Sequence, residues 1–260
     1  MTFILEMLPY FLLIFVRLTS FFIITPLFSM RGVPNQFKVG IAFFLALLAF
    51  SSQTIDEPIP MDVYYILMII KEFAVGLVLG FTAAIVLYAV QVAGAFIDFQ
   101  MGFSMASVMD PQTGTQVPII GHFKYILALL FLLTVDGHHL MLDGVMQSIK
   151  LFPVELMSFT VQFEDIAHFI TTLFLEMFMI ALQIALPVVG SLFLIDIALG
   201  ILAKTVPQLN IFAVGFPVKI FVGFVMLMLT MPFFFYVLQS LFGKIIENMA
   251  QLIRLLGGGI

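Results

Sequence analysis

The sequence has no cysteine and no tryptophan, and charged side chains make up only 10% of its 260 residues. The absence of cysteine excludes disulfide bonds and thiolate chemistry. The absence of tryptophan leaves six tyrosines as the residues that could mark a membrane–water interface. The net charge of -5 is spread thinly, with no basic run of the kind that binds nucleic acid. We therefore expect no nucleic-acid partner.

What the sequence has instead is apolar: 63% of its residues are hydrophobic, including 32 phenylalanines and 17 methionines. Soluble domains carry about 25% charged residues, so a soluble fold could not hide this much apolar surface. The apolar runs are continuous, whereas a membrane barrel shows alternating segments of roughly 10 residues. The fold class is therefore all-α, a polytopic helical membrane protein. The start of the chain, MTFILEMLPYFLLIFVRLTSFF, predicts a first membrane helix because it lacks a basic region and a cleavage site.

Segment lengths predict long, partly broken helical hairpins within one domain, residues 1–260. The expected hydrophobic segments are 3–29, 39–55, 63–97, 119–142, 166–202 and 210–242. Several exceed the roughly 20 residues that span a bilayer core. Pro187, Pro217 and Pro232 are expected to interrupt the last two segments, which lipid tolerates only where protein or water repairs the lost hydrogen bonds. The tail after Gly243 has helical apolar spacing and predicts an interfacial or partner-binding helix.

Ionisable side chains occur inside the apolar runs, at Arg17, Lys71, Glu72, Glu176, Asp196 and Lys219. Each costs about 2.5–3.5 kcal/mol at the bilayer centre, so these groups should face partners, water or the interface. Structural pairing is favoured over an ion or proton pathway. Lys71 and Glu72 are sequence neighbours and should point to different helix faces, which argues against their pairing. The Gly76–Gly80 GxxxG pattern predicts a close helix approach.

Two patterns suggest chemistry but lack the residues that would complete it. Asp136-Gly-His-His139 followed by Asp143 places possible metal ligands on one helix face. No HExxH or cysteine pattern supports a metal, so a polar turn at a membrane interface is favoured. Ser104 follows Gly102-Phe103 as in intramembrane hydrolases, but no base can be assigned to it. We therefore expect no metal, no cofactor and no enzyme activity.

Residues 94–118, GAFIDFQMGFSMASVMDPQTGTQVP, follow a membrane run without being a typical solvated loop. Polar backbone flanked by Phe and Met is typical of a broken helix that lines a cavity. An interfacial loop packed on its own bundle fits equally well. The three side chains that could close such a cavity are Phe103, Met105 and Met109. The surrounding polar and glycine positions are Asp98, Gln100, Gly102, Asp110 and Pro111.

Residues 200–220 interrupt two apolar runs with prolines, glycines, lysines and a Gln/Asn pair. Thr205 to Asn210 are expected to form a turn in which Pro207 ends one helix and Asn210 caps the next. Gly215 and Pro217 should then break this next helix early. An ordinary loop followed by a kinked helix remains the alternative.

Four stretches in order resemble the flagellar biosynthetic protein FliR family, the membrane subunit of the type III export gate. They are FVRLTSFFIITPLFSMRGVPNQFKVGIAFFLA (15–46), QVAGAFIDFQMGFSMASVMDPQTG (91–114), DGHHLMLDGVMQSIKLFP (136–153) and LPVVGSLFLIDIALGILAKTVPQLNIFAVGFPVKI (186–220). Together they cover much of the chain. The virulence-associated secretion systems have a related subunit.

The resemblance implies a subunit of the bacterial inner membrane and flagellar basal body that assembles with FliP and FliQ and contacts FlhB. Unfolded flagellar proteins would pass through the assembly, and residues 98–116 would form the loop that helps to plug the closed channel. The hairpin tip would dock on partner subunits through residues drawn from Pro207, Gln208, Asn210, Gly215, Pro217 and Lys219.

Two alternatives stay open beside the flagellar channel subunit. One is the equivalent subunit of a virulence type III secretion system. The other is an autonomous ion-coupled secondary transporter that would use acidic and basic groups within its spans, namely Glu72, Asp98, Asp196 and Lys219.

Overall fold

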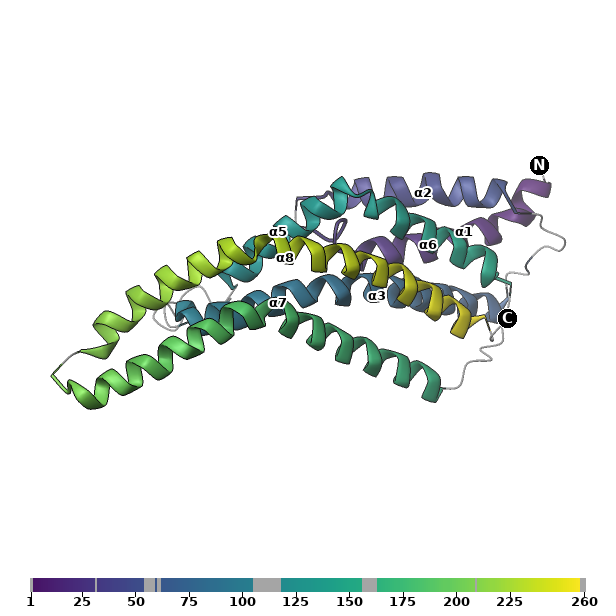
Figure 1. Cartoon of the computed structure of the whole chain (residues 1–260). Helices are drawn as coiled ribbons and strands as arrows, with labels where there is room; N and C mark the ends of the chain where they lie inside the picture. The colour runs from purple at the N-terminus through teal and green to yellow at the C-terminus, as the bar shows by residue number, and fades with distance from the viewer. Residues whose placement is uncertain are drawn as a thin grey trace. The chain divides into compact units, whose positions relative to one another are not determined.

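The computed structural model describes residues 2–30, 32–53, 59, 62–104, 118–155, 163–208 and 210–257. Its regular secondary structure within these ranges is α-helical, with no strand, which confirms the predicted all-α class (Figure 1). The helices are α1 (Thr2–Ile24), α2 (Asn35–Ser51), α3 (Val63–Met101), α5 (Ile119–Thr134), α6 (Gly137–Leu151), α7 (Phe163–Thr205) and α8 (Ile211–Leu256).

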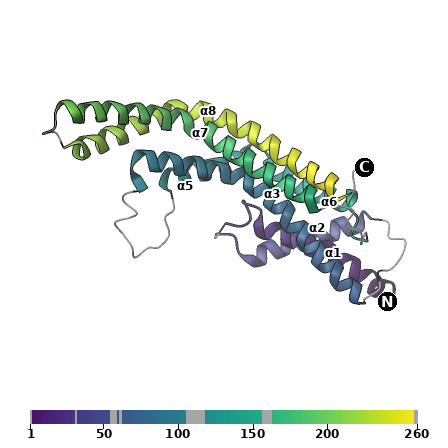
Figure 2. The same cartoon turned by 90° about the horizontal axis from the view of Figure 1, so that it is seen from below.

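Four helices in the described ranges are long and apolar enough to cross a membrane. They are Met7–Ile24 within α1, all of α3, Glu164–Thr205 within α7, and α8. The α5–α6 pair supplies a fifth if the two helices form one bent span. The chain is therefore a multi-pass helical membrane protein. In both views α7 and α8 lie antiparallel on either side of the turn that joins them (Figures 1 and 2).

The helices divide between two compact units. The first unit comprises residues 1–86, 132–173 and 243–260, and the second comprises residues 87–131 and 174–242. In the first unit α1 packs on α2 through aromatic edges. The Phe11 ring meets Phe43 at 5.4 Å and Phe50 at 6.1 Å between centroids, both in T-shaped arrangements, a geometry that adds to the apolar burial.

The crossing of α1 and α3 in the first unit depends on the GxxxG glycines. A methyl group at Gly76 would lie 2.0 Å from Ser20 Oγ and 2.2 Å from the Arg17 carbonyl oxygen. A methyl at Gly80 would lie 2.8 Å from the Phe21 carbonyl oxygen. Larger side chains at either position would push the two backbones apart. The predicted close approach at this pattern is confirmed.

The tail after Gly243 differs from its prediction, because it is not a separate interfacial helix but the last part of α8. Its apolar face is buried inside the first unit, with Met249, Leu252 and Ile253 at most 2% exposed. Met249 fills the space above Gly144 of α6, where a methyl would come within 2.7 Å of its Cε. The apolar spacing therefore serves intramolecular packing.

The predicted proline interruptions are also wrong, since α7 continues through Pro187 and α8 through Pro217 and Pro232. A proline removes a single backbone hydrogen bond, and membrane helices tolerate that loss where local adjustment satisfies the freed carbonyl. Residues 94–101, expected in a broken helix, likewise belong to a regular α3.

The expected segment 119–142 is broken at Asp136-Gly137, within the stretch for which the sequence favours a polar turn. There α5 ends at Thr134 and α6 begins at Gly137. Asp136 between them has φ 54° and ψ 23°, in the left-handed region that Asp tolerates better than most residues. A methyl at Gly137 would lie 2.5 Å from Leu132 Cδ1. The backbone therefore turns sharply at this corner.

Candidate functional site

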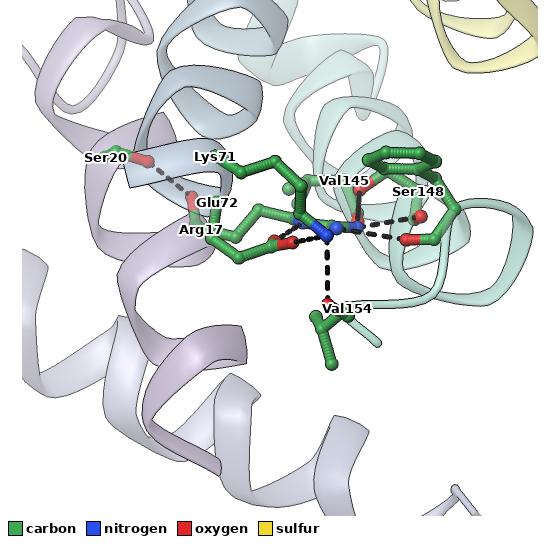
Figure 3. Close-up of polar contacts among 8 residues, drawn as sticks. Arg17, Ser20, Lys71, Glu72, Val145, Ser148 and Val154 are labelled. Carbon is green, nitrogen blue, oxygen red and sulfur yellow. Dashed lines mark hydrogen bonds and ion pairs between the residues drawn. The ribbon is translucent and has the colours of Figure 1, made fainter. Parts of the chain in front are cut away.

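Three charged side chains that the sequence placed in membrane segments meet in the first unit, from α1 and α3 (Figure 3). Arg17 Nε lies 2.5 Å from Glu72 Oε2, and Lys71 Nζ lies 2.8 Å from Glu72 Oε1. Arg17 and Glu72 are fully buried and Lys71 is nearly so. Lys71 and Glu72 therefore pair, contrary to the expectation from their adjacency in the sequence. A lysine has four methylenes, enough to bring its ammonium round to the neighbouring carboxylate although the two Cα–Cβ bonds diverge.

Backbone carbonyls at the end of α6 complete this cluster. Arg17 donates from Nη1 to the Ser148 oxygen at 2.8 Å and from Nη2 to the Phe152 oxygen at 3.0 Å. Lys71 Nζ donates to the Val154 oxygen at 2.9 Å. Ser148 lies in the last turn of α6, and Phe152 and Val154 follow the end of the helix, where backbone carbonyls carry partial negative charge. They therefore offset the second cation of a cluster that holds two cations and one anion.

The Phe152 ring adds a further favourable contact, since Arg17 Cζ and Lys71 Nζ lie 5.5 Å and 5.0 Å from its centroid. The cluster thus joins α1, α3 and the end of α6 through charge-assisted bonds. This arrangement matches structural pairing, the interpretation favoured from the sequence. The carbonyl partners were not predictable, because no side-chain pattern marks them.

In the second unit, Asp98 of α3 holds the beginning of α5. Its carboxylate accepts the Ile120 N–H at 3.0 and 3.1 Å and the Gly121 N–H at 3.2 Å. The first N–H groups of a helix lack internal acceptors and attract anions. The backbones touch nearby, since a methyl at Gly94 would lie 2.1 Å from Gly121 Cα. Asp98 therefore ties the end of α3 to the start of α5.

Gln100, the penultimate residue of α3, joins an ion pair between α7 and α8 of the same unit. Gln100 Nε2 donates to Asp196 Oδ2 at 2.7 Å, and Lys219 Nζ lies 2.5 Å from Asp196 Oδ1. The pair is half-buried, with side-chain exposures of 37% for Asp196 and 20% for Lys219. It borders a groove of about 260 Å³ lined by Asp196, Leu199, Gly200, Ile211, Phe212, Gly215, Phe216 and Lys219.

The three residues after Gln100 are also held in the second unit. Gly102 has φ 89°, which glycine adopts without strain, and a methyl there would lie 2.5 Å from a carbon of the Phe216 ring. The Met101 side chain lies against Gly223 of α8, and the Phe103 ring stands 6.3 Å from that of Phe224. The other expected gate residues, Met105, Met109, Asp110 and Pro111, lie outside the described residues.

The hairpin tip between α7 and α8 has the predicted cap. α7 ends at Thr205, α8 begins at Ile211, and Asn210 Oδ1 accepts the Ala213 N–H at 3.2 Å. Pro207 and Gln208 are exposed in the turn. Of the other expected docking residues, Pro217 is exposed, whereas Gly215 is buried. The expected early break at Gly215 and Pro217 is absent, so the tip is continuous with a regular helix.

Two more charged residues lie within the apolar runs, Glu176 and Lys124. Glu176 of α7 is half-buried and has a polar or ionic interaction within the chain. Lys124 of α5 escaped sequence reasoning although it is only 1% exposed. Its Nζ lies 4.6 Å from the Phe234 ring centroid, a cation–π contact in the second unit. The signal was present, because Lys124 stands in the apolar run from 119 to 142.

The α7–α8 hairpin leaves much of its apolar surface uncovered. In the most apolar 18-residue stretch of α3, 67% is buried inside the structure. The corresponding shares in α7 and α8 are 33% and 22%. Phe212, Phe221, Met228 and Tyr236 of α8 are each more than 70% exposed. A surface of this kind requires lipid or protein neighbours.

Comparisons with known proteins show the family of the chain. The family model described as "Bacterial export proteins, family 1" matches residues 8–245. The flagellar biosynthetic protein FliR of Bacillus subtilis (strain 168) is 50% identical, over 98% of both chains. The FliR of Escherichia coli (strain K12) is 29% identical over 88% of this chain and 86% of its own.

A relative with a different name is also similar. The Yop proteins translocation protein T of Yersinia pestis is 26% identical over 78% of each chain. The similarity to the FliR proteins is higher and covers more of the chain. The chain therefore belongs to the flagellar biosynthetic protein FliR family of bacterial export proteins.

Proposed function

We propose that this chain acts as one domain, a structural channel subunit of the flagellar type III export gate in the inner membrane. It assembles with FliP and FliQ, contacts FlhB, and lines part of the path by which unfolded flagellar proteins leave the cell. It contributes structure and no catalysis. Its family membership supports this proposal.

The observation that carries the proposal is the size and exposure of the α7–α8 hairpin. α7 has 43 residues and α8 has 46. At a rise of 1.5 Å per residue they measure about 65 and about 69 Å. A hydrocarbon core is about 30 Å thick, and the tilts of up to about 40° seen in membrane proteins do not absorb such a length. The surplus apolar length is best covered by neighbouring subunits.

Purification in mild detergent tests the assembly. The tagged full chain should co-purify with small hydrophobic partner subunits. Phe221→Ala and Met228→Ala should weaken this association while leaving the isolated chain equally stable, because both side chains are over 70% exposed. Leu192→Ala, at a fully buried position, is the matched control and should destabilise the chain itself. A lone chain that restores full export would refute the proposal.

The channel role is supported by the way the described residues on either side of 105–117 are held. Before this segment, α7 and α8 contact Gln100, Gly102 and Phe103. After it, the start of α5 is bound by Asp98. A segment anchored at both ends can act as a plug without drifting from the pore. We assign the seal to Phe103, Met105 and Met109.

Alanine substitutions of these three residues should raise ion leak through the assembled gate at normal subunit levels. Phe99→Ala is the matched control, since Phe99 is 73% exposed near the end of the same helix. An assembled triple variant with unchanged membrane conductance would exclude the plug assignment.

The charged groups that an ion-coupled transporter would need already bind other groups of the protein in the described structure. Glu72 binds two cations, Asp98 binds two backbone N–H groups, and Asp196 pairs with Lys219. This supports structural roles. The 50% identity to a FliR protein, against 26% to Yop proteins translocation protein T, supports flagellar substrates over those of a virulence system.

A further inference from the structure

The corner between α5 and α6 brings together two imidazoles and a carboxylate. Asp136, His138 and His139 each offer one ligand atom, and these three atoms lie within 4.8 Å of one another. His139 Nδ1 is 3.6 Å from Asp136 Oδ1, and the two imidazole rings are 4.1 Å apart between centroids. All three residues belong to the first unit.

The backbone of the corner holds these donors near one another. The left-handed Asp136 accepts at its carbonyl the N–H of His139 at 3.0 Å, so it is fixed one turn from that residue. The tight contact of Gly137 with Leu132 limits how far the turn can open. Helical spacing alone groups His139 with Asp136 and Asp143 on one face. It leaves out His138, which is brought in because Asp136 lies outside the helix.

One buried polar atom of this group has no hydrogen-bond partner among the described residues. This atom is Nδ1 of His138. The Asp136 and His139 side chains are 78% and 69% exposed. An exposed pair at 3.6 Å contributes little by itself. A buried imidazole nitrogen without a partner points to a ligand that the protein residues do not supply.

We propose that Asp136, His138 and His139 form a binding site for a divalent transition-metal ion that prefers imidazole, with Zn²⁺ as the reference ion. Bonds to Zn²⁺ of about 2.0–2.2 Å place tetrahedral ligands about 3.4 Å apart. The donors, which lie within 4.8 Å of one another, therefore need to close by up to about 1.4 Å, which rotation of two exposed side chains provides. Two imidazoles and one carboxylate fit Zn²⁺, Ni²⁺ or Cu²⁺ and leave a position for water.

A bound ion would clamp the corner by joining the residue before α6 to its first turn. Ions that bind only the folded state stabilise it by mass action. The expected consequence is a metal-dependent rise in the thermal stability of the first unit. This inference does not depend on the proposed channel role.

The chain offers a clean background for the test. It has no cysteine, and its four histidines comprise this pair and the exposed His122 and His168. Zn²⁺ titration of the full chain in detergent by calorimetry should give one site per chain. His138→Ala, His139→Ala and Asp136→Asn should each weaken binding at least tenfold. His122→Ala and His168→Ala should leave it unchanged.

The variants are chosen to preserve the fold. Alanine favours helix at positions 138 and 139, and asparagine tolerates the left-handed backbone at 136. Copper bound to the unmodified chain gives a second readout, since its paramagnetic resonance should show nitrogen from two imidazoles. Equal Zn²⁺ binding by the site variants and controls, or a copper spectrum with one nitrogen or none, would overturn the proposal.

Discussion

Replacement of Glu72 by glutamine tests the buried cluster most sharply. The cluster of Arg17, Lys71 and Glu72 carries a net charge of +1, offset by the carbonyls at the end of α6. Glu72→Gln keeps the shape of the side chain but leaves two buried cations and no anion. Removing one partner of a buried pair costs about 3–5 kcal/mol, because the remaining charge is uncompensated.

The net charge of the cluster predicts the order of thermal stability among its variants. Lys71→Met leaves a neutral Arg17–Glu72 pair and loses one hydrogen bond to the Val154 carbonyl, which costs about 1–2 kcal/mol. Combining Lys71→Met with Glu72→Gln returns the net charge to +1 and should be less damaging than Glu72→Gln alone. Electrostatics thus predicts that adding a second mutation to Glu72→Gln restores stability.

Thermal unfolding of the chain in detergent, followed by far-UV circular dichroism, measures this order. Glu72→Gln should lower the midpoint by on the order of 10 °C, given about 2–4 °C for each kcal/mol in chains of this size. The control is Glu247→Gln, at an exposed position of α8, which should melt like the unmodified chain. If Glu72→Gln melts like this control, or the double variant melts below Glu72→Gln, the electrostatic account is wrong.

Three further changes test packing and capping. Gly94→Ala should lower the free energy of unfolding by at least about 1–3 kcal/mol, because the methyl would lie 2.1 Å from Gly121 Cα. Gly190→Ala, with open space around it, should raise this free energy by up to about 1 kcal/mol through helix propensity. Thermal melting measures both changes. Asp98→Asn should free the start of α5 and raise ion leak through the assembled gate, and unchanged conductance would count against a positioning role. Asn210→Ala removes the α8 cap, worth about 1 kcal/mol, and should reduce partner co-purification and motility together.

Local features of this fold were predictable because a few neighbouring residues determine them. The spacing of Gly76 and Gly80 predicted a close crossing, and α1 passes there. Asn210 after Pro207 predicted a helix cap, and its side chain accepts the expected N–H. In both places the residues within about one helical turn are sufficient to predict the feature.

Features that depend on distant residues were not predictable in the same way. The adjacency of Lys71 and Glu72 argued against pairing, yet Arg17 and the end of α6 draw the two side chains together. The prolines predicted helix breaks, but α7 and α8 continue through them. The polar turn favoured at Asp136 is present, but its left-handed backbone conformation was not predicted.

Photo-crosslinking from position 103 tests the channel claim most directly. A photoreactive residue at Phe103 should capture a flagellar substrate arrested during export, because we propose that this residue lies at the anchored end of the plug. The control position is Tyr236, which is 72% exposed on α8 and should capture neighbouring subunits or lipid. An assembled, exporting gate that gives no substrate crosslink from position 103 would contradict the proposal that this chain lines the export path.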